Sequence, residues 1–136
     1  RGSLSHVRRV CCLADEATLQ LRSDKRRFPP YGLWGGKPGH PSWNILRPGD
    51  GEVILPTMGT APMRRGDVIM HIMASGGGWG DPLERDPGLV REDVWSEKLS
   101  ISHARSEYGV VIDSETFQVD QEATERLRHE LRNGGA

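Results

Sequence analysis

The stretch DVIMHIMASGGGWGDPLERDP, residues Asp67 to Pro87, carries three successive signals that decide how this chain folds. In its first part, five of the six side chains from Val68 to Met73 are apolar, and alternate side chains of a strand point to opposite faces. This pattern predicts a central strand that is buried on both faces. The glycines that follow favour close approach of neighbouring backbone and a sharp exit from that strand.

Two Asp-Pro pairs close the stretch and predict the starts of helical turns. Asp81 and Asp86 each place a good N-cap acceptor before a proline, a residue favoured at the first helical position. The second pair predicts the clearer helix, with Val90 on the packed face and with Asp93 and Glu97 facing water. The stretch therefore predicts a crossing from a buried strand into helices.

The residues before this stretch are typical of strands and turns. Residues 6–13 and 18–24 are expected to be strands joined by a hairpin at residues 14–17, and a further strand is expected at residues 52–55. Between Phe28 and Gly51, proline and glycine are so dense that the pattern predicts an ordered loop with aromatic anchors and no long element.

The residues after the stretch predict short helices and one strand. A helix is expected from Ser102 to Gly109, a strand from Val110 to Asp113, and a final helix that begins near Asp120. We therefore expect an α+β fold in a single domain over residues 1–136, with a β-rich core shaped as a small antiparallel barrel or sandwich. Residues 1–80 would be β and loop-rich, and residues 81–136 would be short helices plus one strand.

Charge and cysteine content narrow the class of protein. The formal net charge is −1, which gives no reason to expect a nucleic-acid or membrane-surface partner. The apolar runs are far shorter than the roughly 20 residues needed to span a bilayer, and the start has no apolar segment typical of a secretion signal. The two cysteines, Cys11 and Cys12, are adjacent, so neither a relaxed disulfide nor a shared metal site is expected. These features favour a cytoplasmic protein with one packed and one exposed thiol.

The glycine cluster does not fit a nucleotide-binding loop. A phosphate-binding loop needs a lysine and a hydroxyl after its last glycine, and Gly80 is followed by Asp81 and Pro82. The histidines are scattered, and only His103 lies one helical turn from a carboxylate, a spacing more typical of solvated neighbours than of a metal site. His71, within an apolar strand, is expected to be a hydrogen-bonded core histidine. The residues therefore predict no active site, metal site or cofactor site of the chain's own.

Aromatic side chains are concentrated beside glycine and proline. Rigid loops could present them to a partner, since tryptophan is a typical interface anchor, or the tryptophans could cover this domain's own core. The candidate interface residues are Phe28, Tyr31, Trp34, Trp43 and Trp79.

Three blocks resemble the C-terminal region of the hydantoinase B/oxoprolinase family. They are SDKRRFPPYGLWGGKPG (Ser23 to Gly39), GGGWGDPLERDP (Gly76 to Pro87) and YGVVID (Tyr108 to Asp113), in the family's order and spacing. The resemblance implies a large subunit that works with a hydantoinase A-like partner. That partner binds ATP and phosphorylates an enol or amide oxygen, and the pair hydrolyses a lactam, hydantoin or oxoproline, or carboxylates a ketone.

The resemblance covers only the tail of such a subunit, without the body expected to carry metal and substrate. It implies the small subunit of a multi-subunit ketone carboxylase of the acetophenone carboxylase type, inactive alone, with ATP and a divalent metal on the larger hydantoinase B-like and hydantoinase A-like subunits. Alternatives are the tail of an ATP-dependent hydantoinase or oxoprolinase, or a free-standing binding or regulatory module. If the chain contributes to chemistry, the candidates are Arg26, Arg27 and Lys37, because cations stabilise charge that develops near a labile phosphate.

Overall fold

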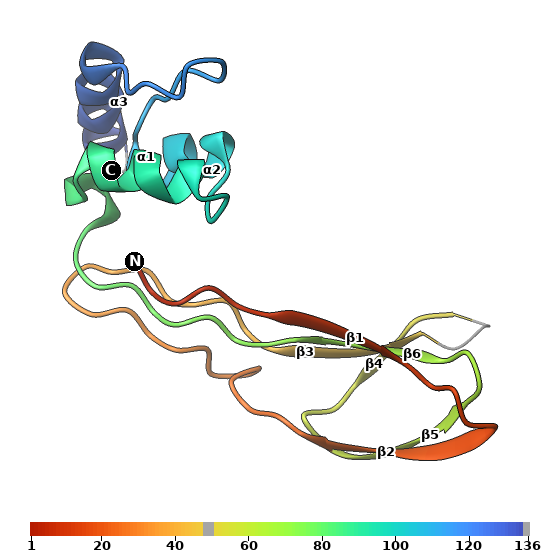
Figure 1. Cartoon of the computed structure of the whole chain (residues 1–136). Helices are drawn as coiled ribbons and strands as arrows, with labels where there is room; N and C mark the ends of the chain where they lie inside the picture. The colour runs from red at the N-terminus through yellow and green to blue at the C-terminus, as the bar shows by residue number, and fades with distance from the viewer. Residues whose placement is uncertain (48–50, 135–136) are drawn as a thin grey trace. The chain divides into compact units, whose positions relative to one another are not determined.

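The computed structural model describes residues 1–47 and 51–134. The chain divides into two compact units, Arg1–Trp79 and Gly80–Ala136, which we call the N-terminal and the C-terminal unit. The N-terminal unit contains the strands of both sheets, and the C-terminal unit contains the helices (Figure 1). This arrangement confirms the α+β class. In the part of the chain that the structure describes, no helix has the length and apolar character needed to cross a membrane.

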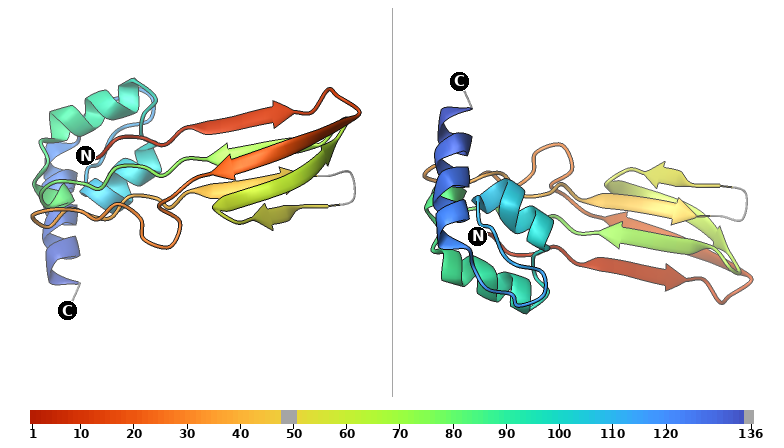
Figure 2. Two further views of the ribbon diagram at one scale, coloured as in Figure 1. Left: turned by 90° about the horizontal axis from the view of Figure 1, so that it is seen from below. Right: turned by 90° about the horizontal axis from the view of Figure 1, so that it is seen from above.

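The N-terminal unit contains two antiparallel sheets. The four-stranded sheet has the order β1-β6-β3-β4, and the two-stranded ribbon pairs β2 with β5 (Figure 2). The sheet is not closed into a barrel, so of the two expected shapes only the layered one is realised. The strands are β1 (Val7–Cys11), β2 (Glu16–Arg22), β3 (Trp43–Arg47), β4 (Val53–Leu55), β5 (Met58–Arg64) and β6 (Val68–Ile72).

The prediction that residues 68–73 form a central strand is confirmed. β6 lies between β1 and β3 and pairs with both. Ile69 and Met70 are both buried although their side chains leave opposite faces of the strand. Leu21 and Met63 of the ribbon meet Leu46, Leu55 and Ile69 of the four-stranded sheet in one apolar core.

Three expectations for this unit are wrong, and each failed because distant pairing outweighed local pattern. β1 and β2 do not form a hairpin, because β1 pairs with β6 and β2 pairs with β5. The turn that joins β1 to β2 is instead tied to the turn before β6, since Cys12 N donates to Asp67 O at 2.8 Å. Strand β3 lies within the segment predicted to be a loop. Strand β5 was missed because it contains a glycine and Pro62, which an outer ribbon tolerates.

A buried polar network joins the two layers. Asn44 is 1% exposed. Its Nδ2 donates to Ser23 Oγ at 2.8 Å and to the Pro56 carbonyl at 3.0 Å, and His71 Nδ1 lies 2.6 Å from its Oδ1. Because the amide oxygen only accepts, the ring proton of His71 is on Nδ1. The expectation of a hydrogen-bonded core histidine is confirmed.

The C-terminal unit consists of four short helices whose starts are capped by side chains. Asp81, Asp86, Ser100 and Asp120 each accept a hydrogen bond from a backbone N–H of the first turn. The predicted starts at the two Asp-Pro pairs and near Asp120 are confirmed, whereas α2 begins slightly earlier than predicted. The helices are η1 (Pro82–Glu84), α1 (Pro87–Trp95), α2 (Ile101–Tyr108) and α3 (Gln121–Asn133).

The core of this unit corrects two further expectations. Asp93 does not face water: it is 6% exposed, and its Oδ2 accepts a hydrogen bond from Arg85 Nη2 at 3.0 Å. It is buried because Arg85, in the link between η1 and α1, reaches back over the first turns of α1 and neutralises it. The expected strand at residues 110–113 is a single bridge between Ile112 and Val119. The apolar core comprises Val90, Val94, Ala104, Tyr108, Val110 and Ile112.

Candidate functional site

Three extended segments of the N-terminal unit, residues 2–6, 30–41 and 73–79, lie side by side (Figure 1). We call them the glycine-lined segments. The third lies between the other two: Gly76 N donates to Ser3 O at 3.1 Å on one side, and Gly78 N donates to Lys37 O at 2.9 Å on the other. The chain thus continues as hydrogen-bonded, non-strand backbone beyond the sheet.

Glycine is required where these backbones meet. A Cβ on Gly77 would overlap the carbonyl of Tyr31, and a Cβ on Gly36 would overlap the carbonyl of Gly78. The expectation that these glycines permit close backbone approach is therefore confirmed. The amides of Gly76 and Gly78 are donated to neighbouring carbonyls, so the peptide N–H groups that would hold a phosphate are already engaged.

A tight turn at Leu33 to Gly36 places Trp34 in solvent. Gly36 N donates to Leu33 O at 2.9 Å, and Trp34 and Gly35 have φ angles of 51° and 86°. A left-handed conformation is unusual for a bulky residue and costs about 1–3 kcal/mol. The side chain gains little burial in return, since Trp34 is 77% exposed.

Trp79 lies beside this turn. Leu33 and Trp79 form a parallel backbone bridge, and the ring centroids of Trp34 and Trp79 are 6.0 Å apart with planes inclined at 49°. Trp79 is 69% exposed and Leu33 is 48% exposed. We call these three residues the tryptophan patch. Such a patch, rigidly held and strained into solvent, has the character of an interface anchor.

The other predicted interface residues lie in different surroundings. Phe28 and Tyr31 are exposed, whereas Trp43 begins β3 and is half-buried. The guanidinium of Arg26 lies 4.3 Å from the centroid of the Trp43 ring. Trp43 therefore serves the packing of this unit, while the remaining aromatic residues of the loop face solvent.

The three basic candidates are not equivalent. Arg26 Nη1 donates to the Leu55 carbonyl at 2.7 Å, and its Nη2 is buried without a hydrogen-bond partner among the described residues. Arg27 lies over the ring of Phe28 at 5.5 Å and is exposed, as is Lys37 in the glycine-lined segments. Arg26 is thus a structural tie between the loop and β4, whereas Arg27 and Lys37 remain accessible to a ligand or partner.

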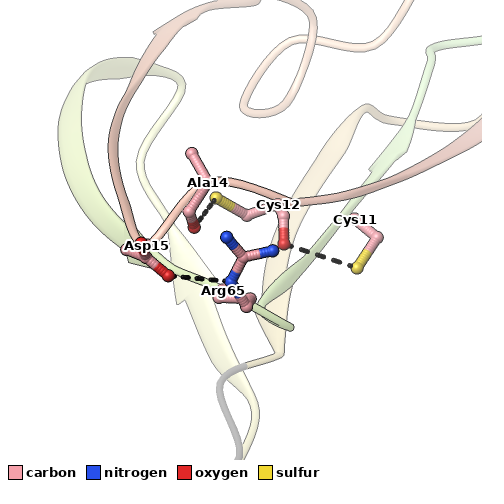
Figure 3. Close-up of polar contacts among 5 residues, drawn as sticks. All are labelled: Cys11, Cys12, Ala14, Asp15 and Arg65. Atoms are coloured by element: carbon pink, nitrogen blue, oxygen red, sulfur yellow. Dashed lines mark hydrogen bonds and ion pairs between the residues drawn. The ribbon is translucent and has the colours of Figure 1, made fainter.

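The cysteines lie at the turn after β1, as Figure 3 shows. Cys11 is exposed, and Cys12 packs against the core and directs its thiol towards the Ala14 carbonyl at 3.4 Å, so the expectation of one exposed and one packed thiol is confirmed. The neighbouring ion pair joins Arg65 Nε and Asp15 Oδ1 at 2.8 Å. Within residues 1–47 and 51–134, no three His, Cys, Asp or Glu side chains are grouped as a metal site would require.

A division of charge between the two units was missed in the sequence. Residues 1–79 hold 11 of the 18 Lys and Arg and 6 of the 19 Asp and Glu, while residues 80–136 hold 7 and 13. The net charge of −1 therefore conceals a basic and an acidic unit. Counting charges separately on either side of the glycine cluster would have revealed it.

Comparison with known proteins now assigns the family. The model of the family described as Hydantoinase B/oxoprolinase matches residues 1–82, and the chain belongs to that family. It is 33% identical over 130 residues to the uncharacterized protein MJ0963 of Methanocaldococcus jannaschii, covering 94% of this chain and 23% of that protein. It is 38% identical over 68 residues to the acetophenone carboxylase delta subunit of Aromatoleum aromaticum, covering 49% of this chain and 10% of that subunit.

A solved structure extends the likeness to the fold. The ATP-dependent caprolactamase from Pseudomonas jessenii is 33% identical and superimposes with a TM-score of 0.69, over 85% of this chain and 21% of that chain. The predicted resemblance to the hydantoinase B/oxoprolinase family is confirmed. The chain spans less than a quarter of the length of the curated relatives it matches.

Proposed function

We propose that this chain supplies the C-terminal region of a hydantoinase B-like subunit in an ATP-dependent amide hydrolase acting on a lactam, hydantoin or related cyclic amide. The observation that carries the proposal is the match to the caprolactamase, which extends over 85% of this chain at 33% identity. The acetophenone carboxylase match covers 49% of the chain. Agreement over both units favours the amide hydrolase.

In the reaction that the family resemblance implies, the partner transfers the γ-phosphoryl group of ATP to the amide oxygen. Water then adds to the activated carbon, the C–N bond breaks, and phosphate is released with ADP. ATP and the divalent metal are held by the larger subunits. This chain is accessory: its glycine-lined segments form a rigid backbone layer, and its tryptophan patch docks on a larger subunit.

Arg27 and Lys37 are the residues of this chain that would approach the phosphorylated intermediate. Both are exposed, and both lie in the same loop as the tryptophan patch. A cation brought close to the labile phosphate by docking would stabilise the charge that develops on it. Arg26 has a different role, since its contacts with Leu55 and Trp43 hold the loop against the sheet.

The second candidate is the small subunit of a ketone carboxylase of the acetophenone type. The 38% identity to the acetophenone carboxylase delta subunit over 68 residues favours it. ATP would then activate the ketone as an enol phosphate, and bicarbonate would provide the carboxyl group through a carboxyphosphate-like species. The accessory role of this chain would be the same.

Purification of the tagged chain with its bound partners separates these functions. The complex is assayed for ATP-dependent ring opening of caprolactam, hydantoin and 5-oxoproline, and for bicarbonate fixation on acetophenone and acetone. We expect amide hydrolysis by the complex and none by the isolated chain. Ketone carboxylation without amide hydrolysis would establish the second candidate. A monomeric chain that recovers no larger subunit would favour a free-standing module and contradict both.

A further inference from the structure

A second surface of the N-terminal unit, distant in sequence from the tryptophan patch, has the composition of an interface. Residues directly opposite each other on paired strands share a face of the sheet. The register Val7↔Ile72↔Trp43 and the register Arg9↔Met70↔Ile45↔Ile54 therefore lie on one face, opposite to the core. With Cys11, Val68 and Arg47 of the next register, these residues form what we call the outer sheet face.

The outer sheet face is apolar where a solvated face would be polar. An antiparallel sheet that covers a core on one side and faces water on the other alternates apolar and polar residues. Here the outward residues of β6 are Val68, Met70 and Ile72, all apolar. Val7 and Ile54, on the two edge strands, are 56% and 57% exposed.

Met70 lies at the centre of this face. It is 7% exposed, yet it belongs to neither apolar core and is covered by its neighbours within the sheet. Its burial means that the centre of the face is already dry and that the apolar side chains around it are only partly covered. A surface of this kind marks a protein contact.

The ribbon provides an internal comparison. Strand β2 directs Leu19 and Leu21 into the core and presents Glu16, Thr18, Gln20 and Arg22 outward, all exposed. The same unit thus follows the ordinary alternation on the ribbon and departs from it on the outer sheet face. The apolar character is therefore specific to that face and is not a general feature of the unit.

We infer that the outer sheet face packs against the remaining body of a hydantoinase B-like subunit. This inference rests on the proposed function. In the caprolactamase, the fold shared with this chain is 21% of a much longer chain, so the same sheet is there accompanied by about four times as much protein. The curated relatives have the same proportion, since this chain covers 23% of the first of them.

The charges around the face define the partner's surface. Arg9 and Arg47 both lie on the outer sheet face and flank its apolar centre. Residues 1–79 have an excess of basic over acidic side chains, 11 against 6. The partner therefore presents an apolar strip bordered by carboxylates, which would pair with the two arginines and repel an acidic substitution on this chain.

Substitution of exposed residues on the two layers tests the inference. Val7→Asp and Ile54→Asp alter the outer sheet face, and Thr60→Asp on the outward side of the ribbon is the matched control. All three positions are exposed, and thermal unfolding of the isolated variants checks that folding is retained. Binding of each tagged full-length variant to the larger hydantoinase B-like subunit is measured by titration.

We expect Val7→Asp and Ile54→Asp to weaken binding at least tenfold and Thr60→Asp to leave it unchanged. Equal binding by all variants, or no binding of any hydantoinase B-like subunit by the wild-type chain, would overturn the inference. A concentration-dependent dimer of the isolated chain that Ile54→Asp abolishes would assign the face to a second copy and also overturn it. Because binding is read without turnover, failure of the amide-hydrolase assignment alone leaves these outcomes distinct.

Discussion

Trp34 and Trp79 hold their rings 6.0 Å apart on two neighbouring backbone segments, and both rings are largely exposed. One of the two, Trp34, has a left-handed backbone conformation that an isolated tryptophan would avoid. The pair is therefore fixed in place by the glycine-lined segments and is not the result of local collapse. Its orientation towards solvent is costly for this chain alone, and it gains a purpose when a partner covers it.

Trp34→Gly separates stability from binding. Relief of the left-handed strain, about 1 kcal/mol or more, offsets loss of the ring contact, about 0.5–1.5 kcal/mol. Urea denaturation of the isolated chain is therefore expected to shift by less than about 1 kcal/mol, whereas affinity for the larger subunits falls by about 2 kcal/mol. Trp95→Ala removes an exposed tryptophan from α1 and serves as the control. Equal loss of binding by both variants would refute an anchor at Trp34.

Gly77→Ala tests the close packing of the glycine-lined segments. The added Cβ would meet the Tyr31 carbonyl, and backbone on both sides leaves it no space. We expect a loss of at least about 3 kcal/mol in the free energy of unfolding, at the upper end of overpacking effects. Gly66→Asn is the control, because nothing lies within 4 Å of its Cβ and asparagine tolerates a positive φ. Similar urea midpoints for the two variants would contradict the packing.

Asp93→Ala tests the buried ion pair of the C-terminal unit. Its removal leaves Arg85 with a partly buried charge and no carboxylate, and breaking such a pair costs about 3 kcal/mol. Glu92→Ala, on the exposed side of the same helix, is expected to change stability by less than about 0.5 kcal/mol. Thermal unfolding followed by circular dichroism compares the two, and comparable losses would show that the pair is unimportant.

Asp113 gives the C-terminal unit a defined acid sensitivity. Hydrogen bonds from the Thr116 backbone and hydroxyl and from Glu115 N lower the pKa of its carboxyl below the ordinary 3.8. A folded-state pKa below the unfolded one contributes stability above the unfolded value, and this contribution is lost as the pH falls through the folded value. The stability difference between the wild type and Asp113→Ala should therefore be constant from pH 7 to 5 and shrink below pH 4. A difference independent of pH, in urea titrations at each pH, would count against it.

The sequence predicted those elements whose causes are local. An aspartate before a proline caps its own helix, and Asp81 and Asp86 do so whatever surrounds them. Continuous apolar character likewise identified β6 as central. Pairing between distant strands has no such local signal, so the partners of β1 and β2 were misjudged. The burial of Asp93 depended on Arg85, whose side chain reaches it from outside the helix.

The candidate site was predicted as residue types and not as an arrangement. Tryptophans beside glycine suggested exposed anchors, and Trp34 and Trp79 are exposed, whereas Trp43 packs under Arg26. The outer sheet face was not predictable, because its members come from four strands and meet only through the observed register. Val7 and Ile54 give no sign in the sequence that they belong to one surface.

The glycine-lined segments also bear on how far family membership informs chemistry. Much of what identifies this chain as a hydantoinase B relative lies in glycines that exist to let carbonyls and amides come together. An enzyme that opens a lactam and one that carboxylates a ketone can share these positions for the same steric reason. Likeness in these blocks is evidence of shared architecture, and the choice of substrate has to be sought in side chains elsewhere in the assembled enzyme.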